Sequence, residues 1–274
     1  EIGVARCDAL LKRLGQESRS AAKRARAVWR QSFALAVRHE VLVRNPIDNV
    51  SRLHKPKRTP TVLSATEVNA IRAVIKAWEL SRGTSGPNPD GQLGQIVEVM
   101  LGTAARIGEV LAIRRRDLDL TTTPATLRIC GTVISERGVG TYRQEHPKTD
   151  RSNRVVALPS FTAEALRRRL AIMADHSLDA LVFRSREGTP LTTANVRRQL
   201  RKVLGAAGIE GVSPHMFRRT VATVINEQAS LNLASELLGH TDPKVTIEHY
   251  IRRNEQVNPL TAELLDQAFA REDD

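Results

Sequence analysis

The sequence predicts a mainly α-helical protein with a small antiparallel three-stranded β-sheet inserted between its helices. Apolar residues recur at helical spacing through most of the 274 residues, and alternation replaces that spacing only around residues 126–158. A basic stretch with two prolines near residue 55 separates a short N-terminal part from the rest. Apolar residues make up 41% of the chain, and no run approaches the ~18 consecutive apolar residues of a transmembrane helix.

The N-terminal part is expected to contain two helices, at residues 5–13 and 18–39. In the second, apolar residues form a stripe and most of the basic residues lie off it. Two helices bury too little for an independent core, so residues 1–54 are predicted to be a partial helical domain that lacks part of its bundle. Because the chain begins at Glu1 rather than Met, we expect it to be a fragment of a longer protein.

Residues 55–62 are predicted to be a linker, stiffened by proline. Positive charge is concentrated on and before it: residues 1–60 carry 14 Lys and Arg against 5 Asp and Glu, out of a net charge of +12 for the whole chain. A solvated basic face is one interpretation, and contact with phosphates is the favoured one. The candidate nucleic-acid contacts are Lys23, Arg24, Arg26, Lys55, Lys57 and Arg58.

After the linker, a capping box of Ser64 and Glu67 predicts a helix that runs to about Leu80. A loop follows at 81–91, then a helix from Leu93 that is interrupted at Gly102 and resumes over 109–113. Alternation then predicts three strands that form a meander, at residues 126–133, 141–145 and 154–158. The remaining helices are expected at about 162–174, 193–206, 214–228, 230–238, 243–252 and 260–270.

The two cysteines, Cys7 and Cys130, lie far apart in the sequence and form neither a disulfide framework nor a metal-binding CxxC motif. The N-terminus shows no signal-peptide pattern, so we expect a cytoplasmic protein. We expect no metal, no cofactor and no membrane partner.

Four short patterns carry residues that are suited to phosphate chemistry. Arg106 follows small residues, with Glu109 one helical turn later to hold it. His215 and Arg218 lie on one face near the start of a helix, where anions bind favourably. Each pattern alone could be an ordinary surface ion pair or a chance spacing.

The other two patterns involve Lys148, His240 and Tyr250. Lys148 is expected in the turn between two predicted strands, where a lysine is usually just solvated. His240 follows Gly239 at a predicted corner between helices, and Tyr250 is expected near the end of the next helix. Tyr250 could equally be a core aromatic residue.

The order and spacing of Arg106, Lys148, His215, Arg218, His240 and Tyr250 resemble those of the tyrosine recombinase family, the phage integrases and their relatives. The resemblance runs from about Leu63 to Tyr250 and includes GTAARIGEVLAIRRRDLDL, HPKTDRSNRVVALP, PHMFRRTVATVI and LLGHTDPKVTIEHY. Residues 1–54 resemble the last helices of the family's core-binding domain. One departure is Ala104, where members of the family usually have glycine.

The resemblance implies a catalytic domain at residues 63–274, with a C-terminal docking tail from about residue 254. It implies that Tyr250 attacks a DNA phosphate and forms a 3′-phosphotyrosyl intermediate. Arg106 and Arg218 would hold the phosphate oxygens, Lys148 would protonate the leaving oxygen, His215 would assist proton transfer, and His240 would hydrogen-bond the phosphate. The implied partners are double-stranded DNA and, in the synaptic complex, three further copies of a chain that is monomeric when free.

Two alternatives remain open. A type IB topoisomerase-like enzyme would nick and close DNA with the same residues. A non-catalytic DNA-binding regulator would need only the basic N-terminal segment, but it leaves the six-residue pattern unexplained. The amphipathic run after Tyr250 suits docking on a neighbouring copy and therefore favours a recombinase of a phage or mobile element.

Overall fold

The computed structural model describes residues 2–52, 60–81, 89–145, 153–239 and 246–247. The chain divides into two compact units, residues 1–58 and 59–274. The predicted linker at 55–62 spans the junction between them. No helix in the described part of the chain is both long and apolar enough to cross a membrane.

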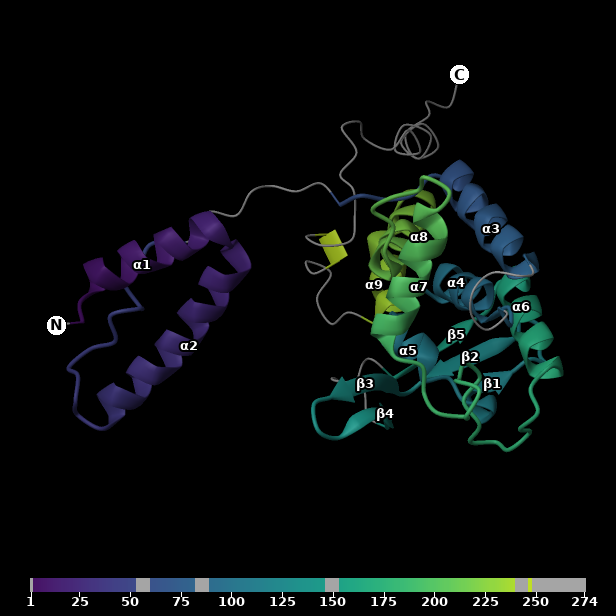
Figure 1. Ribbon diagram of the computed structural model, residues 1–274, viewed down its shortest axis with the longest axis horizontal. Helices are drawn as coiled ribbons and strands as arrows, with labels where there is room; N and C mark the ends of the chain where they lie inside the picture. The colour runs from purple at the N-terminus through teal and green to yellow at the C-terminus, as the bar shows by residue number, and fades with distance from the viewer. Residues whose placement is uncertain (1, 53–59, 82–88, 146–152, 240–245, 248–274) are drawn as a thin grey trace, which may run out of the picture. The chain divides into compact units, whose positions relative to one another are not determined.

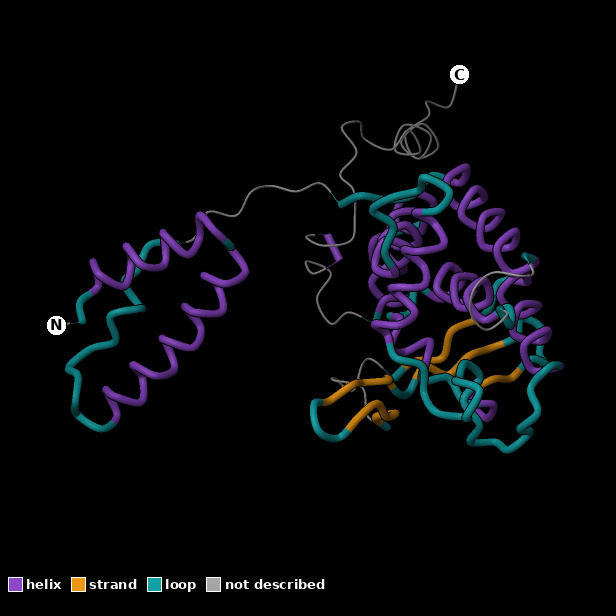
Figure 2. The backbone as a smooth tube through the Cα atoms, viewed as in Figure 1, coloured by secondary structure: helices purple, strands orange, loops and turns teal. Residues whose placement is uncertain are grey.

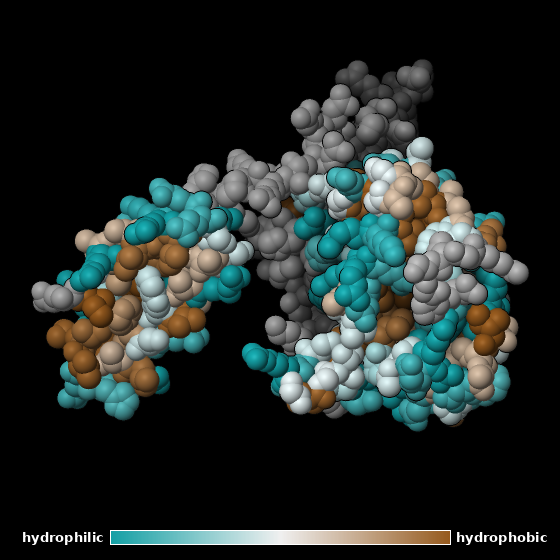
Figure 3. All heavy atoms as spheres, viewed as in Figure 1, coloured by the Kyte–Doolittle hydropathy of each residue, from teal (hydrophilic) through white to brown (hydrophobic). Residues whose placement is uncertain are grey.

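The first unit is a pair of helices, α1 (Val4–Glu17) and α2 (Arg19–Arg38), which Figure 1 shows as a hairpin. Ser18 ends α1 and caps α2, where its hydroxyl accepts from the amide of Ala21. The core is small, centred on the buried residues Cys7, Leu11, Ile47 and Val50. Apolar side chains therefore stay on the surface of this unit, as Figure 3 shows.

Two of those exposed residues belong to the apolar stripe of α2. The predicted apolar stripe of the second helix includes Val28 and Leu35, but their exposed fractions are 59% and 49%. The neighbouring helix α1 covers only part of this apolar stripe.

The second unit combines a helical layer with two small antiparallel sheets (Figures 1 and 2). Its helices are α3 (Ala65–Leu80), α4 (Gln92–Thr103), α5 (Ile107–Leu111), the short 3-10 helix η1 (Arg115–Asp117), α6 (Ser160–Ala171), α7 (Thr193–Gly205), α8 (Pro214–Gln228) and α9 (Leu231–Leu238). The capping box that opens α3 is confirmed: the amide of Ser64 donates to Glu67 Oε2 at 2.7 Å, and Ser64 Oγ accepts from the Glu67 amide at 3.2 Å.

Helix α4 lies at the centre of this unit and buries most of its residues. It packs closely against α6 because Gly102 has no side chain: a Cβ there would lie 1.9 Å from Thr162 Oγ1. The same glycine, which the sequence presents as an interruption of a helical pattern, therefore lies inside α4 as a packing site.

The strands are β1 (Leu118–Asp119), β2 (Thr126–Ile129), β3 (Thr132–Glu136), β4 (Gly140–Gln144) and β5 (Arg154–Ala157). One sheet has the order β1-β2-β5, with Leu127 opposite Val156. The other is the β3–β4 ribbon, with Ile134 opposite Tyr142. The predicted class, mainly α with a small antiparallel three-stranded sheet, is confirmed.

The predicted meander is wrong in its connections. The expected strand 126–133 is two strands, separated at Cys130 and Gly131, so the chain pairs β3 with β4 and later returns β5 to β2. Alternation continues across the break, and periodicity alone could not locate it. β4 and β5 are therefore not partners; Lys148 comes between them in the sequence and lies outside the described residues.

Candidate active site

Arg106 stands at the N-cap of α5, directly after a sharp turn. Helix α4 ends at Thr103, and Ala104 takes a left-handed conformation with φ of 51°. Glu109 then closes a capping box: its carboxylate accepts from the Arg106 amide at 2.9 Å and from Arg106 Nη1 at 2.7 Å. The Arg106 side chain is 43% exposed, so its guanidinium is held in place and is still reachable from solvent.

Arg218 lies on α8 and is 1% exposed. Its Nη1 donates to the carbonyl of Ala104 at 2.6 Å, and its Nη2 donates to the carbonyl of Leu238 at 2.7 Å. Both carbonyls belong to the C-terminal ends of helices, α4 and α9, which carry partial negative charge. The guanidinium therefore fastens three helices together beside the turn that carries Arg106.

Glu109 is the common anion of this cluster and is 5% exposed. Arg154, at the start of β5, donates from Nη2 to Glu109 Oε2 at 3.3 Å. Burial alone would raise the pKa of Glu109, but the charges of Arg154, Arg106 and Arg218 more than offset it and hold the pKa below the ordinary value. Glu109 is thus ionised, pairs with Arg154 and so links α5 to β5.

His215 lies in the first turn of α8, whose N-cap is Ser213 and whose first residue is Pro214. Desolvation by the surrounding chain, together with the charges of Arg219, Arg218, Arg106 and Arg197, lowers the pKa of His215 to about 4. At neutral pH its imidazole is uncharged and can exchange a proton. Residues from α5, α7 and α8 therefore meet in one electropositive site.

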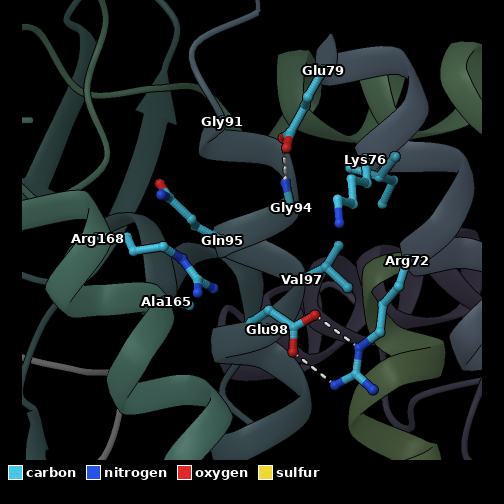
Figure 4. A pocket seen from close by; sticks show the side chains of 11 residues that line it. Arg72, Lys76, Glu79, Gly91, Gly94, Gln95, Val97, Glu98, Ala165 and Arg168 are labelled. Carbon is cyan, nitrogen blue, oxygen red and sulfur yellow. Dashed lines mark hydrogen bonds and ion pairs between the residues drawn. The ribbon is translucent and has the colours of Figure 1, made fainter.

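A separate pocket lies between α3, α4 and α6 and shares no residue with this cluster (Figure 4). Arg72 forms two hydrogen bonds to Glu98, at 2.8 and 2.7 Å, and Glu79 accepts from the Gly94 amide at 2.8 Å. Glu79 thus caps the N-terminus of α4. Arg72, Glu98 and Glu79 are thus paired within the protein at this pocket, so the arginine cluster remains the candidate active site.

A model described as the phage integrase family matches residues 62–257, which is most of the chain. The chain belongs to the phage integrase family, that is, to the tyrosine recombinases. One relative is the tyrosine recombinase XerC of Bacillus pumilus, which is 30% identical over 233 residues; the match covers 83% of this chain and 68% of the relative. A second XerC, of Bacillus licheniformis, is 28% identical, and 64% of its length is covered.

Solved structures of integrases share the fold. The Tn1549 transposon integrase in complex with transposon right end DNA superposes with a TM-score of 0.78 at 16% identity, covering 98% of this chain and 86% of that one. A lambda integrase dimer bound to a core site gives a TM-score of 0.64 at 18% identity, covering 94% and 67%.

The integrase-family residues expected from the sequence fall into two groups. The structure brings Arg106, His215 and Arg218 together. Lys148, His240 and Tyr250, together with Lys55, Lys57 and Arg58, lie outside the described residues. Residues 246–247 are the described residues nearest to Tyr250 in the sequence; Thr246 is fully buried and accepts a hydrogen bond from Ser235 Oγ of α9 at 3.0 Å.

The three described DNA-contact candidates of the first unit differ. Lys23 and Arg24 are exposed on α2. Arg26 instead donates to the carbonyls of Ser51 and Val50, at 3.2 and 3.3 Å. Its guanidinium thus holds the chain after α2 against the helix. The charge pattern of the sequence does not distinguish such a structural arginine from one that contacts phosphate.

Sequence reasoning missed two parts of the site. Arg154 opens a short alternating strand, and nothing in its neighbours indicates that it reaches Glu109. Arg197 belongs to a row of exposed basic residues on α7, with Arg198, Arg201 and Lys202. The charge density of that helix was the available signal.

The left-handed conformation of Ala104 explains why members of the integrase family usually have glycine at this position. A left-handed conformation costs a residue with a Cβ about 1–2 kcal/mol. Here the methyl group packs in a buried cluster with Ala222 and Leu238, which offsets part of that cost. The departure is therefore compatible with an intact turn before Arg106.

The state of His215 is testable by NMR titration of the free protein. We expect the pKa of its imidazole to be about 4, below the ordinary 6.5, because burial and then the nearby cations disfavour its charged form. A bound DNA phosphate would supply negative charge and move the midpoint upward. The signal is assigned by its loss in His215→Asn, and a midpoint at or above 6.5 in free protein would contradict the cluster.

Proposed function

We propose that the protein is a site-specific DNA recombinase that cleaves and rejoins strands through a 3′-phosphotyrosyl intermediate on Tyr250. The observation that carries the proposal is the meeting of Arg106 and Arg218, remote in sequence, around the buried carboxylate of Glu109 beside a neutral His215. Fixed positive groups of this kind stabilise the charge that develops on a phosphate during transfer.

In the proposed reaction, the Tyr250 oxygen forms a bond to phosphorus as the bond from phosphorus to the 5′-oxygen breaks. His215 assists removal of the tyrosine proton, His240 hydrogen-bonds the phosphate, and Lys148 gives a proton to the 5′-oxygen, so charge does not accumulate on the leaving group. Arg106 and Arg218 hold the non-bridging oxygens. The phosphotyrosyl bond retains the energy that a second 5′-hydroxyl uses to rejoin the strands.

The proposed partners are double-stranded DNA and copies of the same chain. Integrases of similar fold support both: one is the Tn1549 transposon integrase in complex with transposon right end DNA, and another is a lambda integrase tetramer bound to a Holliday junction. We propose a homotetramer on DNA, with residues 1–54 as part of a core-binding domain and residues from about 254 as the docking tail. The exposed basic row of α7 supports a DNA surface beside His215.

The proposal is tested by a covalent adduct. The tightest-binding duplex is selected from a random pool and nicked near the expected cleavage point, so that cleavage releases a short fragment and traps the enzyme. An adduct resistant to denaturation supports the proposal, and its absence on every selected duplex overturns it. Strand transfer between two duplexes indicates a recombinase, whereas relaxation of supercoiled DNA alone indicates a topoisomerase-like enzyme.

The first unit should supply mostly non-specific affinity. Removing one basic side chain from a phosphate lowers the log–log salt slope of DNA binding by about 0.9. Lys23→Gln with Arg24→Gln should therefore flatten the slope, and removal of residues 1–60 should flatten it further. Lys12→Gln, which breaks an exposed pair with Asp8, is the control. An unchanged slope after removal of residues 1–60 would reject this role.

A further inference from the structure

The β3–β4 ribbon packs directly on α5, the helix that begins after Arg106 (Figure 1). The contact is at backbone level because Gly108 of α5 carries no side chain. A Cβ at that position would lie 2.7 Å from Thr132 Oγ1 and 3.1 Å from the carbonyl oxygen of Val133, both on β3. The ribbon and the helix with Arg106 at its cap therefore share one interface.

Arg143 of β4 fastens this interface, and its side chain is 8% exposed. Its Nε donates to the carbonyl of Ala112, the C-cap of α5, at 2.8 Å, and its Nη2 donates to Cys130 Sγ at 3.4 Å. The guanidinium occupies the space above Gly131, where a Cβ would lie 2.4 Å from Nη2. One side chain thus joins β4, the end of α5 and the break between β2 and β3.

Glu145, the residue after β4, is held by the same group. Its Oε2 lies 2.5 Å from Arg143 Nη1 and 3.2 Å from Arg114 Nη1. Arg114 is itself fixed by Asp117, to which its Nε donates at 3.3 Å. The chain therefore leaves the ribbon from an anchored point.

Lys148 follows Glu145 by three residues. Three residues of extended chain span at most about 11 Å, so the anchor at Glu145 limits the region that the Lys148 ammonium can reach. An error of about 1 Å in the placement of a reacting group can cost ~100-fold in rate.

We propose that Arg143 is a positioning residue for DNA cleavage. It holds the β3–β4 ribbon against α5 and so positions Lys148 relative to the phosphate that Arg106 holds. This inference rests on the proposed function, in which Lys148 protonates the leaving 5′-oxygen. Arg143 itself contacts no DNA in this proposal, and Gly131 is the space that it requires.

The test compares two leaving groups on the nicked duplex, an ordinary 5′-oxygen and a 5′-bridging sulfur that leaves without a proton. Arg143→Ala should slow cleavage of the ordinary duplex about 10- to 100-fold with DNA affinity unchanged, and the sulfur duplex should recover most of that loss. Lys148→Ala should show the same pattern with a larger loss. Arg128→Ala, which removes an exposed arginine from β2, is the matched control and should leave both rates unchanged.

Gly131→Ala keeps the proposal testable should Arg143→Ala fail to fold. The three atoms nearest to the added methyl group all belong to the far end of the Arg143 side chain, so the fold should survive while the guanidinium is displaced. Gly131→Ala should reproduce the defect and its rescue by sulfur, yet have no further effect in the Arg143→Ala background. A wild-type rate in Gly131→Ala, or a defect that is equal for both leaving groups, overturns the inference. Failure of the proposed function is distinct, because wild type would then form no adduct or sulfur would not rescue Lys148→Ala.

Discussion

Tyr250→Phe should eliminate the covalent protein–DNA adduct completely and leave DNA affinity unchanged. The phenol oxygen is the atom that bonds to phosphorus in the proposed reaction, and phenylalanine removes that atom alone. The adduct is measured as a labelled nicked duplex that migrates with the protein on a denaturing gel. In this mechanism wild type should give the same amount of adduct with and without EDTA, because the arginine cluster supplies the positive charge on the phosphate.

The matched control is Tyr142→Phe, which removes the other tyrosine hydroxyl of the chain. Tyr142 lies on β4, and its hydroxyl donates to Glu136 Oε2 at 3.0 Å. That hydrogen bond to a carboxylate raises the pKa of Tyr142, which makes it a poorer nucleophile. Tyr142→Phe should keep the adduct. An adduct in Tyr250→Phe, or wild-type cleavage that EDTA abolishes, would reject the mechanism.

Glu109→Ala should destabilise the protein by about 3–5 kcal/mol and lower the cleavage rate by at least ~100-fold. The substitution leaves Arg154 buried without its anion, removes the negative charge near Arg218 and releases Arg106 from its cap. The free energy of unfolding is measured in urea. Glu164→Gln is the control, because it breaks an exposed pair with Arg168 and should cost under about 1 kcal/mol.

The same carboxylate gives a pH dependence with a defined sign. The pKa of Glu109 is lowered below its ordinary 4.5, so its contribution to stability is complete above that value and is lost as the pH falls through the lowered pKa. Glu109→Gln, which is close in shape but uncharged, should therefore lie below wild type in stability at neutral pH, and the gap should narrow below 4.5. A gap that stays constant into acid would show that charge is not the cause.

Local signals in the sequence predicted the described helices well; the helix expected at 260–270, and most of the one expected at 243–252, lie outside the described residues. The Ser64 and Glu67 capping box has one favourable structure, and the structure shows it. The break between β2 and β3 was hidden because its cause is tertiary: Gly131 gives space to Arg143, which comes twelve residues later. Periodicity relates side chains within one strand or one helical turn. The contact between Gly131 and Arg143 is of neither kind, so periodicity does not predict it.

The candidate site was also predictable from the sequence only in part. Family-like spacing led to Arg106, His215 and Arg218, and the structure brings these three together. Their environments were not predictable, because the burial of Arg218 depends on the ends of α4 and α9, and Arg154 reaches Glu109 of α5 from strand β5. Each contact needs the packed arrangement of elements that are far apart in sequence.

The arginine cluster should also make the stability of the free protein depend on the anions in the buffer. Among the described residues, several guanidinium groups surround the single carboxylate of Glu109, so positive charge exceeds negative charge in the site without DNA. We expect a tetrahedral oxyanion such as sulfate to relieve the repulsion between these like charges and to stabilise the folded state by mass action. In the proposed reaction such an anion would take the position of the DNA phosphate, so an anion that raises the stability of the free protein should also compete with DNA.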